Sequence, residues 1–248
     1  MFDRRNRLYM KKIQVQQGLY EPQTESDACG VGFVVDMKGR KSHKIVDNAL
    51  TILKNLLHRG ACGCEENTGD GVGILIQKPH KFFKRVCADI KIELPYDEDY
   101  GTGMVFLPLD KSQLQRCQEI FEKIILEENQ ELLGWRDVPT NDSLLGPTAR
   151  EGEPTFKQIF IGKNSELDSA AFDRKLYVIR KRVENLIWNS GMTEQNLFYI
   201  PSLSYRTFLY KGMLTGTQLE PMFPDLSDPD VESALALVHQ RFSTNTMP

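Results

Sequence analysis

The sequence has no long hydrophobic run and no excess of positive charge. None of its apolar stretches approaches the roughly 18 residues that a membrane-spanning helix needs. Its 31 Lys and Arg residues stand against 34 Asp and Glu, which gives a formal net charge of −3. A chain with this balance lacks the basic surface typical of nucleic-acid-binding proteins. We therefore expect neither a membrane nor a nucleic acid among its partners.

Cysteine is scarce and shows no paired pattern. The five cysteines are an odd number, and their spacings form no disulfide framework. Free thiols are typical of a reducing compartment, so the sequence predicts a cytoplasmic protein. The basic, acid-poor first residues could instead direct the chain to a plastid or a mitochondrion, and no apolar signal-peptide core follows them.

The chain divides into a polar start and one long patterned region. Its 18 glycines and 12 prolines in 248 residues are too few for a low-complexity chain, and 40% hydrophobic residues suffice for a globular core. Residues 1–28 show no hydrophobic period, whereas a strand pattern starts directly after Cys29. We interpret 1–28 as an irregular lead-in and 29–248 as one domain. A disordered tail is the plain alternative for the lead-in.

Short apolar blocks separated by turn residues predict strands and amphipathic helices that do not strictly alternate. Helices are expected after Ser42, after Ser112, which forms a possible capping box with Gln115, and around Phe172, where apolar residues step by 4, 3, 4 and 3. Residues 134–154 are rich in turn residues. This order favours antiparallel sheets with helices packed outside, an α+β fold. The expected strands are 31–35, 74–76, 104–107, 157–162, 198–204 and 207–214, with 234–242 as a weaker candidate.

Two short segments carry reactive or anion-binding side chains at the expected ends of strands. Cys29 stands directly before a glycine and a strand, where a small side chain presents a reactive tip; an incidental buried cysteine is the plain alternative. The segment from His239 to Asn245 ends a strand with a guanidinium and several hydroxyl and amide groups. Arg241 in this segment is suited to bidentate capture of a carboxylate, and a surface salt bridge is its plain alternative.

A third segment combines histidine, cysteine and glycine. It runs from His58 through Cys62 and Cys64 to a glycine-rich stretch at 68–73, in which the backbone can approach a ligand or another strand closely. Phosphate-loop patterns do not fit, because no Gly-Lys-Ser/Thr is present and the loop leads into a strand. Zinc sites normally use two cysteine pairs with wider spacing, so we expect no metal here.

Taken together and in order, the motifs resemble the class II glutamine amidotransferase family, and within it the glutamate synthases. The resemblance covers about residues 18–248. The long separation between Cys29 and Arg241 and the segment at roughly 95–200 distinguish it from other class II amidotransferases. The matching motifs are Gly18-Leu-Tyr-Glu-Pro, Cys29-Gly-Val-Gly-Phe, His58-Arg59-Gly60, Thr68-Gly-Asp-Gly-Val-Gly-Ile, Pro79-His-Lys-Phe-Phe, Tyr210-Lys-Gly-Met-Leu and His239-Gln-Arg-Phe-Ser-Thr-Asn.

The resemblance implies an N-terminal-nucleophile hydrolase fold, in which two stacked antiparallel sheets lie between helical layers (αββα), incomplete at its C-terminal side. It implies that 1–28 is a prosegment and that Cys29, once first in the chain, is the nucleophile that hydrolyses glutamine to glutamate and ammonia for transfer to 2-oxoglutarate. Arg241 and Thr244 are then expected to bind glutamine, with the turn at 58–60 (His58, Arg59, Gly60) as support. Cys29 and Arg241 should lie close together, at the ends of two central strands.

The same resemblance indicates that parts of the family's machinery lie outside these 248 residues. The family's Asn-Gly oxyanion pair has no counterpart in the sequence, and is expected beyond Pro248. No cofactor is expected in this chain, whereas FMN and an iron–sulfur cluster are expected in the rest of a glutamate synthase polypeptide, its expected partner. An inactive, truncated remnant that serves only for binding or assembly is the alternative.

Overall fold

The computed structural model describes residues 30–59, 65 and 67–240. Cys29, Gly60, Arg241 and Thr244 therefore lie outside the described residues. The elements in chain order are β1 (Gly30–Val35), α2 (His43–Asn55), η2 (Leu57–Arg59), β2 (Val72–Gln77), α3 (His80–Asp89), η3 (Asp97–Asp99), β3 (Tyr100–Leu107), α4 (Lys111–Glu127), β4 (Glu131–Asp137), η4 (Asp142–Leu144), α5 (Pro147–Glu151), β5 (Thr155–Gly162), α6 (Ser169–Trp188), η5 (Gln195–Leu197), β6 (Thr207–Gly212), α7 (Leu219–Met222), η6 (Pro224–Ser227) and β7 (Leu235–Gln240).

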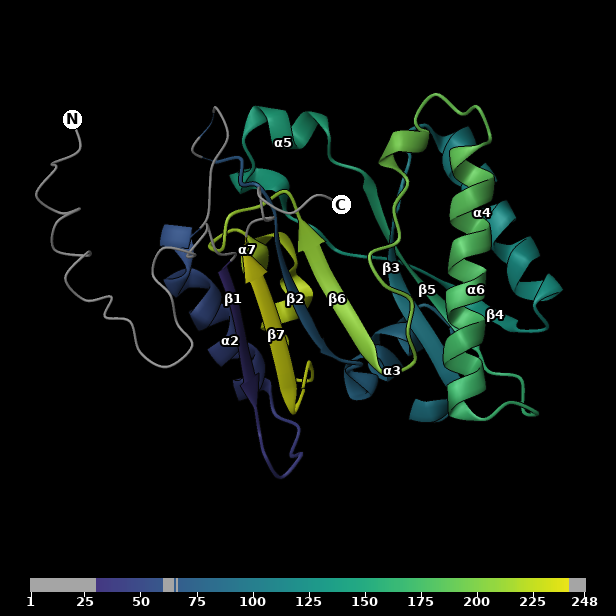
Figure 1. The fold of residues 1–248 in the computed structure, drawn as a ribbon, viewed down its shortest axis with the longest axis horizontal. Helices are drawn as coiled ribbons and strands as arrows, with labels where there is room; N and C mark the ends of the chain where they lie inside the picture. The colour runs from purple at the N-terminus through teal and green to yellow at the C-terminus, as the bar shows by residue number, and fades with distance from the viewer. Residues whose placement is uncertain (1–29, 60–64, 66, 241–248) are drawn as a thin grey trace, which may run out of the picture.

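Two antiparallel sheets organise the molecule, which confirms the α+β class. One sheet has the strand order β1-β7-β2-β6 and the other has the order β3-β5-β4. The sheets adjoin between β6 and β3, where the stretch before β6 makes isolated bridges from Ser204 to Thr102 and from Tyr199 to Phe106 (Figure 1). The helices α4 and α6 lie beyond the three-stranded sheet, and α2 lies behind β1 and β7 (Figure 1).

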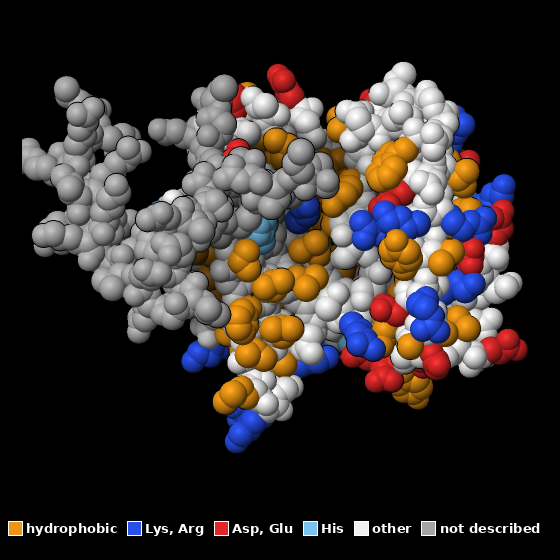
Figure 2. Space-filling model, in the orientation of Figure 1, with side chains coloured by type: hydrophobic (Ala, Val, Ile, Leu, Met, Phe, Trp, Pro, Cys, Tyr) orange, Lys and Arg blue, Asp and Glu red, His pale blue; other side chains and the backbone are white. Residues whose placement is uncertain are grey.

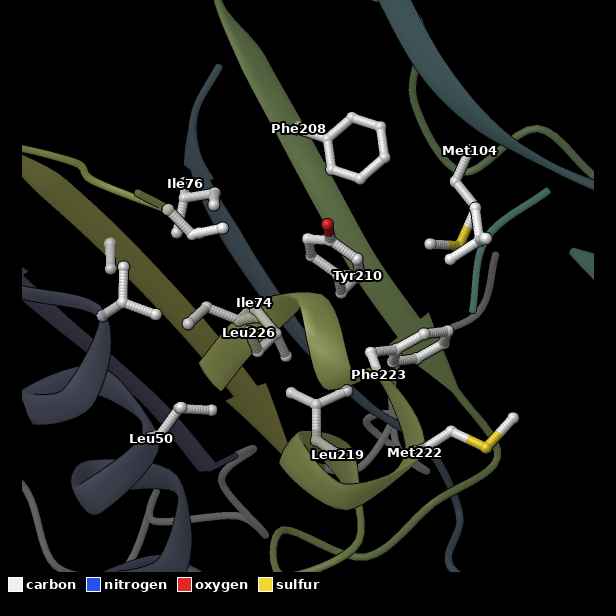
Figure 3. Packing of buried hydrophobic residues seen from close by; sticks show 14 of the residues in the cluster. Leu50, Ile74, Ile76, Met104, Phe208, Tyr210, Leu219, Met222, Phe223 and Leu226 are labelled. Atoms are coloured by element: carbon white, nitrogen blue, oxygen red, sulfur yellow. The ribbon is translucent and has the colours of Figure 1, made fainter. Parts of the chain in front are cut away.

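Strand alternation divides the buried side chains into two clusters. In β5, Phe156 and Phe160 face a cluster shared with the four-stranded sheet, α2, α3 and α7, whereas Ile159 and Ile161 face α4 and α6. Figure 3 shows part of the first cluster, where Tyr210 of β6 packs beside aromatic and aliphatic side chains from the other elements. The strands β3 and β5 are therefore buried on both faces, whereas most residues of β4 are only partly buried.

Several local predictions need correction. The helix near Ser112 begins at Lys111, because the carboxylate of Asp110 accepts the Gln113 N–H at 2.9 Å and the hydroxyl of Ser112 donates to the same carboxylate at 2.6 Å. Residues 198–204 make isolated bridges instead of a strand. The turn-rich stretch begins within β4, whose bulge at Gly134 hides the strand pattern. Helix α3 was not predicted.

A buried ion pair connects the two sheets. The guanidinium of Arg136 on β4 donates two hydrogen bonds of 2.8 Å to the carboxylate of Asp225 on η6, and Tyr210 donates a third at 3.0 Å. Arg136 also donates to Gln158 Oε1 at 3.2 Å. Burial, together with the nearby Asp225, raises the pKa of Tyr210 well above its ordinary value, so its hydroxyl stays protonated and available as a donor.

One face of the four-stranded sheet is apolar, and the described residues leave it largely uncovered. Its middle row runs Phe33–Leu237–Leu75–Leu209 across the four strands, and Val31 and Val35 flank Phe33 on β1. Phe33 is 65% exposed. Figure 2 shows hydrophobic side chains gathered on the same part of the molecule. The opposite face is covered by α2, whose Ile52 leaves no room for a side chain at Gly32. We call the uncovered side the open face.

The open face predicts self-association of the isolated 248-residue chain, because large exposed apolar patches promote contacts between molecules. Phe33→Lys should lower the fraction of the chain found in oligomers or aggregates severalfold, as measured by light scattering over a concentration series. Leu186→Lys is the matched control, because Leu186 on α6 is also about half exposed (49%). An equal effect of both substitutions would show that general charge, not this face, controls association.

No helix in the described part of the chain is long and apolar enough to cross a bilayer.

Candidate functional site

The candidate site lies at one end of the four-stranded sheet. Gly30, the first residue of β1, pairs directly with Gln240, the last residue of β7. Val72 at the start of β2 and Gly212 at the end of β6 complete the same row. The two positions next to the predicted nucleophile and carboxylate ligand thus meet across adjacent strands. Strand β7 is an inner strand, whereas β1 is at the edge of the described sheet, so the expectation of two central strands holds only for β7.

The predicted supporting turn follows the end of α2. His58 lies in the 3-10 turn η2, where it is exposed and its Nδ1 is 3.0 Å from the carbonyl oxygen of Asn55. The end of α2 lies near the same end of the sheet, because Gly216 is packed between the carbonyl of Leu53 and the Gln240 side chain. His58 therefore lies against the last carbonyl group of α2 as a C-terminal capping contact. Its role toward a substrate stays a prediction.

The glycine-rich loop before β2 is held against neighbouring backbone. A side chain on Gly69 would collide with the backbone of Leu214 and Thr215, at 2.2 Å from the Leu214 oxygen and 2.7 Å from the Thr215 nitrogen. Gly71 has a φ of +124°, which favours glycine. The sequence predicted that these glycines let the backbone approach either a ligand or another strand. The structure confirms close approach to another segment of the chain, at Leu214 and Thr215.

The carboxylate of Glu65 and the buried amide of Gln218 hold this loop by hydrogen bonds. Glu65 accepts hydrogen bonds from the hydroxyls of Thr68 and Thr148, both at 2.8 Å, and from the Thr148 N–H at 3.2 Å. These hydroxyl bonds lower the pKa of Glu65, so it stays ionised near neutral pH. The Gln218 amide donates to the carbonyl of Asn67 at 2.9 Å. The loop therefore reaches the site end of the sheet in one defined position.

Two titratable side chains, His239 and Lys211, lie in the next row of paired residues, one position along the strands from the row of Gly30 and Gln240. That row runs Val31–His239–Gly73–Lys211 and faces the open side of the sheet, since Gln240 and Val72 of the previous row are buried on the other side. Partial burial, together with the charge of Lys211, lowers the pKa of His239. The imidazole is therefore neutral at neutral pH. Sequence motifs included both residues but gave neither of them a role.

A cavity of about 410 Å³ opens beside the same end of the sheet. It is lined by Gly71, Lys211 and Gly212, and by apolar residues that include Phe106, Phe156 and Phe223. Glu153 also lines it, and burial together with nearby Asp142 raises the pKa of this carboxyl. The mainly apolar walls favour an uncharged occupant.

Comparison with known proteins places the chain in a family. The family model for class-II glutamine amidotransferases matches residues 29–248. The chain is 46% identical over 233 residues to the glutamate synthase [NADPH] large chain of Bacillus subtilis, covering 94% of this chain and 15% of that protein. It is 42% identical over 246 residues to the glutamate synthase [NADH] of Saccharomyces cerevisiae, covering 95% of this chain and 11% of the relative.

A similar match joins the chain to a ferredoxin-dependent glutamate synthase from Pyropia yezoensis, with 37% identity over 246 residues that cover 99% of this chain and 16% of the relative. The chain thus spans between 11 and 16% of the length of these three relatives.

Proposed function

The chain belongs to the class II glutamine amidotransferases, and from this we propose that it hydrolyses glutamine to supply ammonia within a glutamate synthase, where the ammonia is transferred to 2-oxoglutarate. The observation that carries the proposal is the pairing of Gly30 with Gln240. This pairing supports a site in which Cys29 and Arg241 act on one small substrate, although the two are far apart in sequence.

The proposed chemistry uses Cys29 as both nucleophile and base. The thiol attacks the side-chain carbonyl carbon of glutamine while its proton passes to the α-amine of the same residue, directly or through a water molecule. The C–N bond then breaks, ammonia leaves with that proton, and a thioester remains. Water hydrolyses the thioester to glutamate and restores the thiol. An α-amine has an ordinary pKa of about 7.7–8.0, which suits this task near neutral pH.

This mechanism requires that residues 1–28 are removed, because Cys29 must have a free α-amine. The start of the family match at residue 29 supports that boundary. Arg241 then binds the α-carboxylate of glutamine, with Thr244 beside it, and the turn at 58–60 supports the wall of the site. The hydrogen bonds of Glu65 and Gln218 hold the glycine-rich loop that leads into β2.

Arg241→Lys tests the binding half of the proposal. Lysine keeps the charge but cannot form the bidentate pair, so KM for glutamine should rise roughly 10- to 100-fold in the complete polypeptide. Arg40→Lys is the matched control, because the Arg40 side chain is 72% exposed and pairs only locally with Asp36 among the described residues. A KM for glutamine that is unchanged by Arg241→Lys would remove Arg241 from the site.

The rest of a glutamate synthase polypeptide is the proposed partner, and the open face is the surface on which it is proposed to pack. FMN and an iron–sulfur cluster belong to that remaining part in the proposal. The cytoplasm stays the predicted compartment.

A further inference from the structure

The cavity of about 410 Å³ is lined by residues from both sheets, and the proposed hydrolysis of glutamine does not use it. The three-stranded sheet contributes Phe106 of β3 and Phe156 of β5, and the four-stranded sheet contributes Gly212, the last residue of β6. Phe223, which follows α7, also lines it. The volume is within the roughly 300–1,000 Å³ typical of small-molecule sites, so the cavity is large enough to hold a ligand.

Four aromatic rings line the cavity and contact one another in series. The Phe106 ring packs edge to face against the Phe156 ring, with 4.9 Å between the ring centres, and Phe156 packs in the same way against Phe223 at 5.5 Å. Tyr199 extends the series, because its ring centre lies 5.8 Å from that of Phe106. Aromatic rings make favourable edge-to-face and offset contacts with further rings, so these walls favour a flat aromatic occupant.

Glu153 brings a hydrogen-bond acceptor to this apolar space. Its side chain lines the cavity and is partly buried, and within the described residues no group donates a hydrogen bond to its carboxyl. Burial and the charge of Asp142 raise the pKa of Glu153, whereas the charge of Arg150 acts in the opposite direction. A partly desolvated acceptor without a hydrogen bond costs free energy, so a ligand with an N–H or O–H group gains by reaching it.

The charges that line the cavity favour a neutral ligand. The ammonium of Lys211 lies 5.2 Å from the centre of the Tyr199 ring, and its side chain lines the same space as Glu153. A cationic ligand is repelled by Lys211, and an anionic ligand is repelled by ionised Glu153. A charged group of either sign also loses its hydration against the apolar walls.

We propose that this cavity binds a small, neutral aromatic molecule that carries one N–H or O–H donor. Its ring lies among the aromatic side chains, where apolar surface is removed from water, and its donor bonds to Glu153. The aromatic walls supply most of the affinity, and Glu153 selects for the donor. This binding goes beyond glutamine hydrolysis and does not depend on it.

Indole and N-methylindole are the probes for this site, because methylation removes the only hydrogen-bond donor and keeps the rings. Titration of each probe with the 248-residue chain, followed by broadening of the probe's NMR lines, gives its dissociation constant. Indole should bind with a dissociation constant of about 1 mM or lower, an ordinary value for a ligand of this size. N-methylindole should bind roughly tenfold more weakly, the scale of one hydrogen bond to an ionised group.

Substitutions at Glu153 and Gly152 test the donor contact and the location separately. Glu153→Ala should remove the preference for indole and leave N-methylindole binding unchanged, whereas Glu153→Gln keeps an acceptor oxygen and should keep the preference. Gly152 lines the cavity with a φ of −96°, and a side-chain carbon there would meet only the Thr148 oxygen, at 3.8 Å. Gly152→Leu should therefore fold and weaken indole binding roughly tenfold by filling part of the space.

Ala170→Leu is the matched control for Gly152→Leu, because Ala170 is exposed near the start of α6 and does not line the cavity. Equal binding of the two probes, or indole binding that Gly152→Leu leaves unchanged, would overturn the proposal. The titration is repeated with the complete polypeptide. Indole binding by the 248-residue chain that is lost in the complete polypeptide would show that another part of the polypeptide fills the cavity, and would overturn the proposal as well.

Discussion

Cys29→Ser in the complete polypeptide should lower glutamine-dependent glutamate formation by roughly 10³-fold or more, the scale of loss when an enzymatic nucleophile is replaced. A serine hydroxyl is a much weaker nucleophile than a thiol at neutral pH, and a lone α-amine activates it poorly. Synthesis from added ammonia should be retained, because ammonia bypasses the glutaminase step. Both rates are measured on the same preparation with glutamine or an ammonium salt as nitrogen donor.

A buried cysteine in the described part of the chain provides the control for this substitution. Cys117 is buried, and burial raises its thiol pKa to about 11, so it is unreactive at neutral pH. Cys117→Ala should therefore keep both activities apart from a modest loss of stability. N-terminal sequencing of the active enzyme should begin at Cys29. Equal loss of both activities in Cys29→Ser, or full activity with 1–28 attached, would refute the free-amine mechanism.

Sequence periodicity was sufficient where an element is regular and one of its faces is buried. The apolar spacing from Phe172 predicted α6, in which Phe172, Leu176, Ile179 and Val183 are all buried. The sequence did not predict β4, because a bulge between Leu132 and Gly134 interrupts its alternation of buried and exposed side chains. Most of its residues are also only partly buried. The start of α4 was misplaced because Asp110 and Ser112 are both suitable capping residues, and only the three-dimensional hydrogen bonds distinguish them.

The site shows a different limit of sequence analysis. Motifs predicted Cys29 and Arg241 as site residues, and the structure pairs their described neighbours Gly30 and Gln240, so the proximity of the two residues themselves stays a prediction. The order β1-β7-β2-β6 depends on contacts between distant segments, which local patterns do not specify. Lys211 and His239 share a row because β2 lies between their strands, and Gly73 of β2 pairs with both residues. A motif predicts which residues of one segment are functional, but it does not predict which residues of other strands pair with them.

Asp225→Asn should produce the largest loss of stability among single substitutions that conserve side-chain size. The change leaves the Arg136 guanidinium buried without a counter-charge, and the new amide can no longer accept all three hydrogen bonds from Arg136 and Tyr210. Breaking a buried pair from one side typically costs about 3–5 kcal/mol. Because the pair joins β4 to η6 beside β6, its loss should also loosen the contact between the two sheets.

Urea unfolding of residues 29–248, followed by tryptophan fluorescence at concentrations where the midpoint is constant, measures this loss. Asp142→Asn is the matched control, because Asp142 is 52% exposed and forms a 3.4 Å pair with exposed Arg150, which is worth about 0–1 kcal/mol. The double variant Arg136→Met with Asp225→Leu should recover much of the stability, since it removes both charges. If Asp225→Asn unfolds at the midpoint of Asp142→Asn, the ion pair does not hold the sheets together, and apolar packing around Phe156 and Phe223 must do so instead.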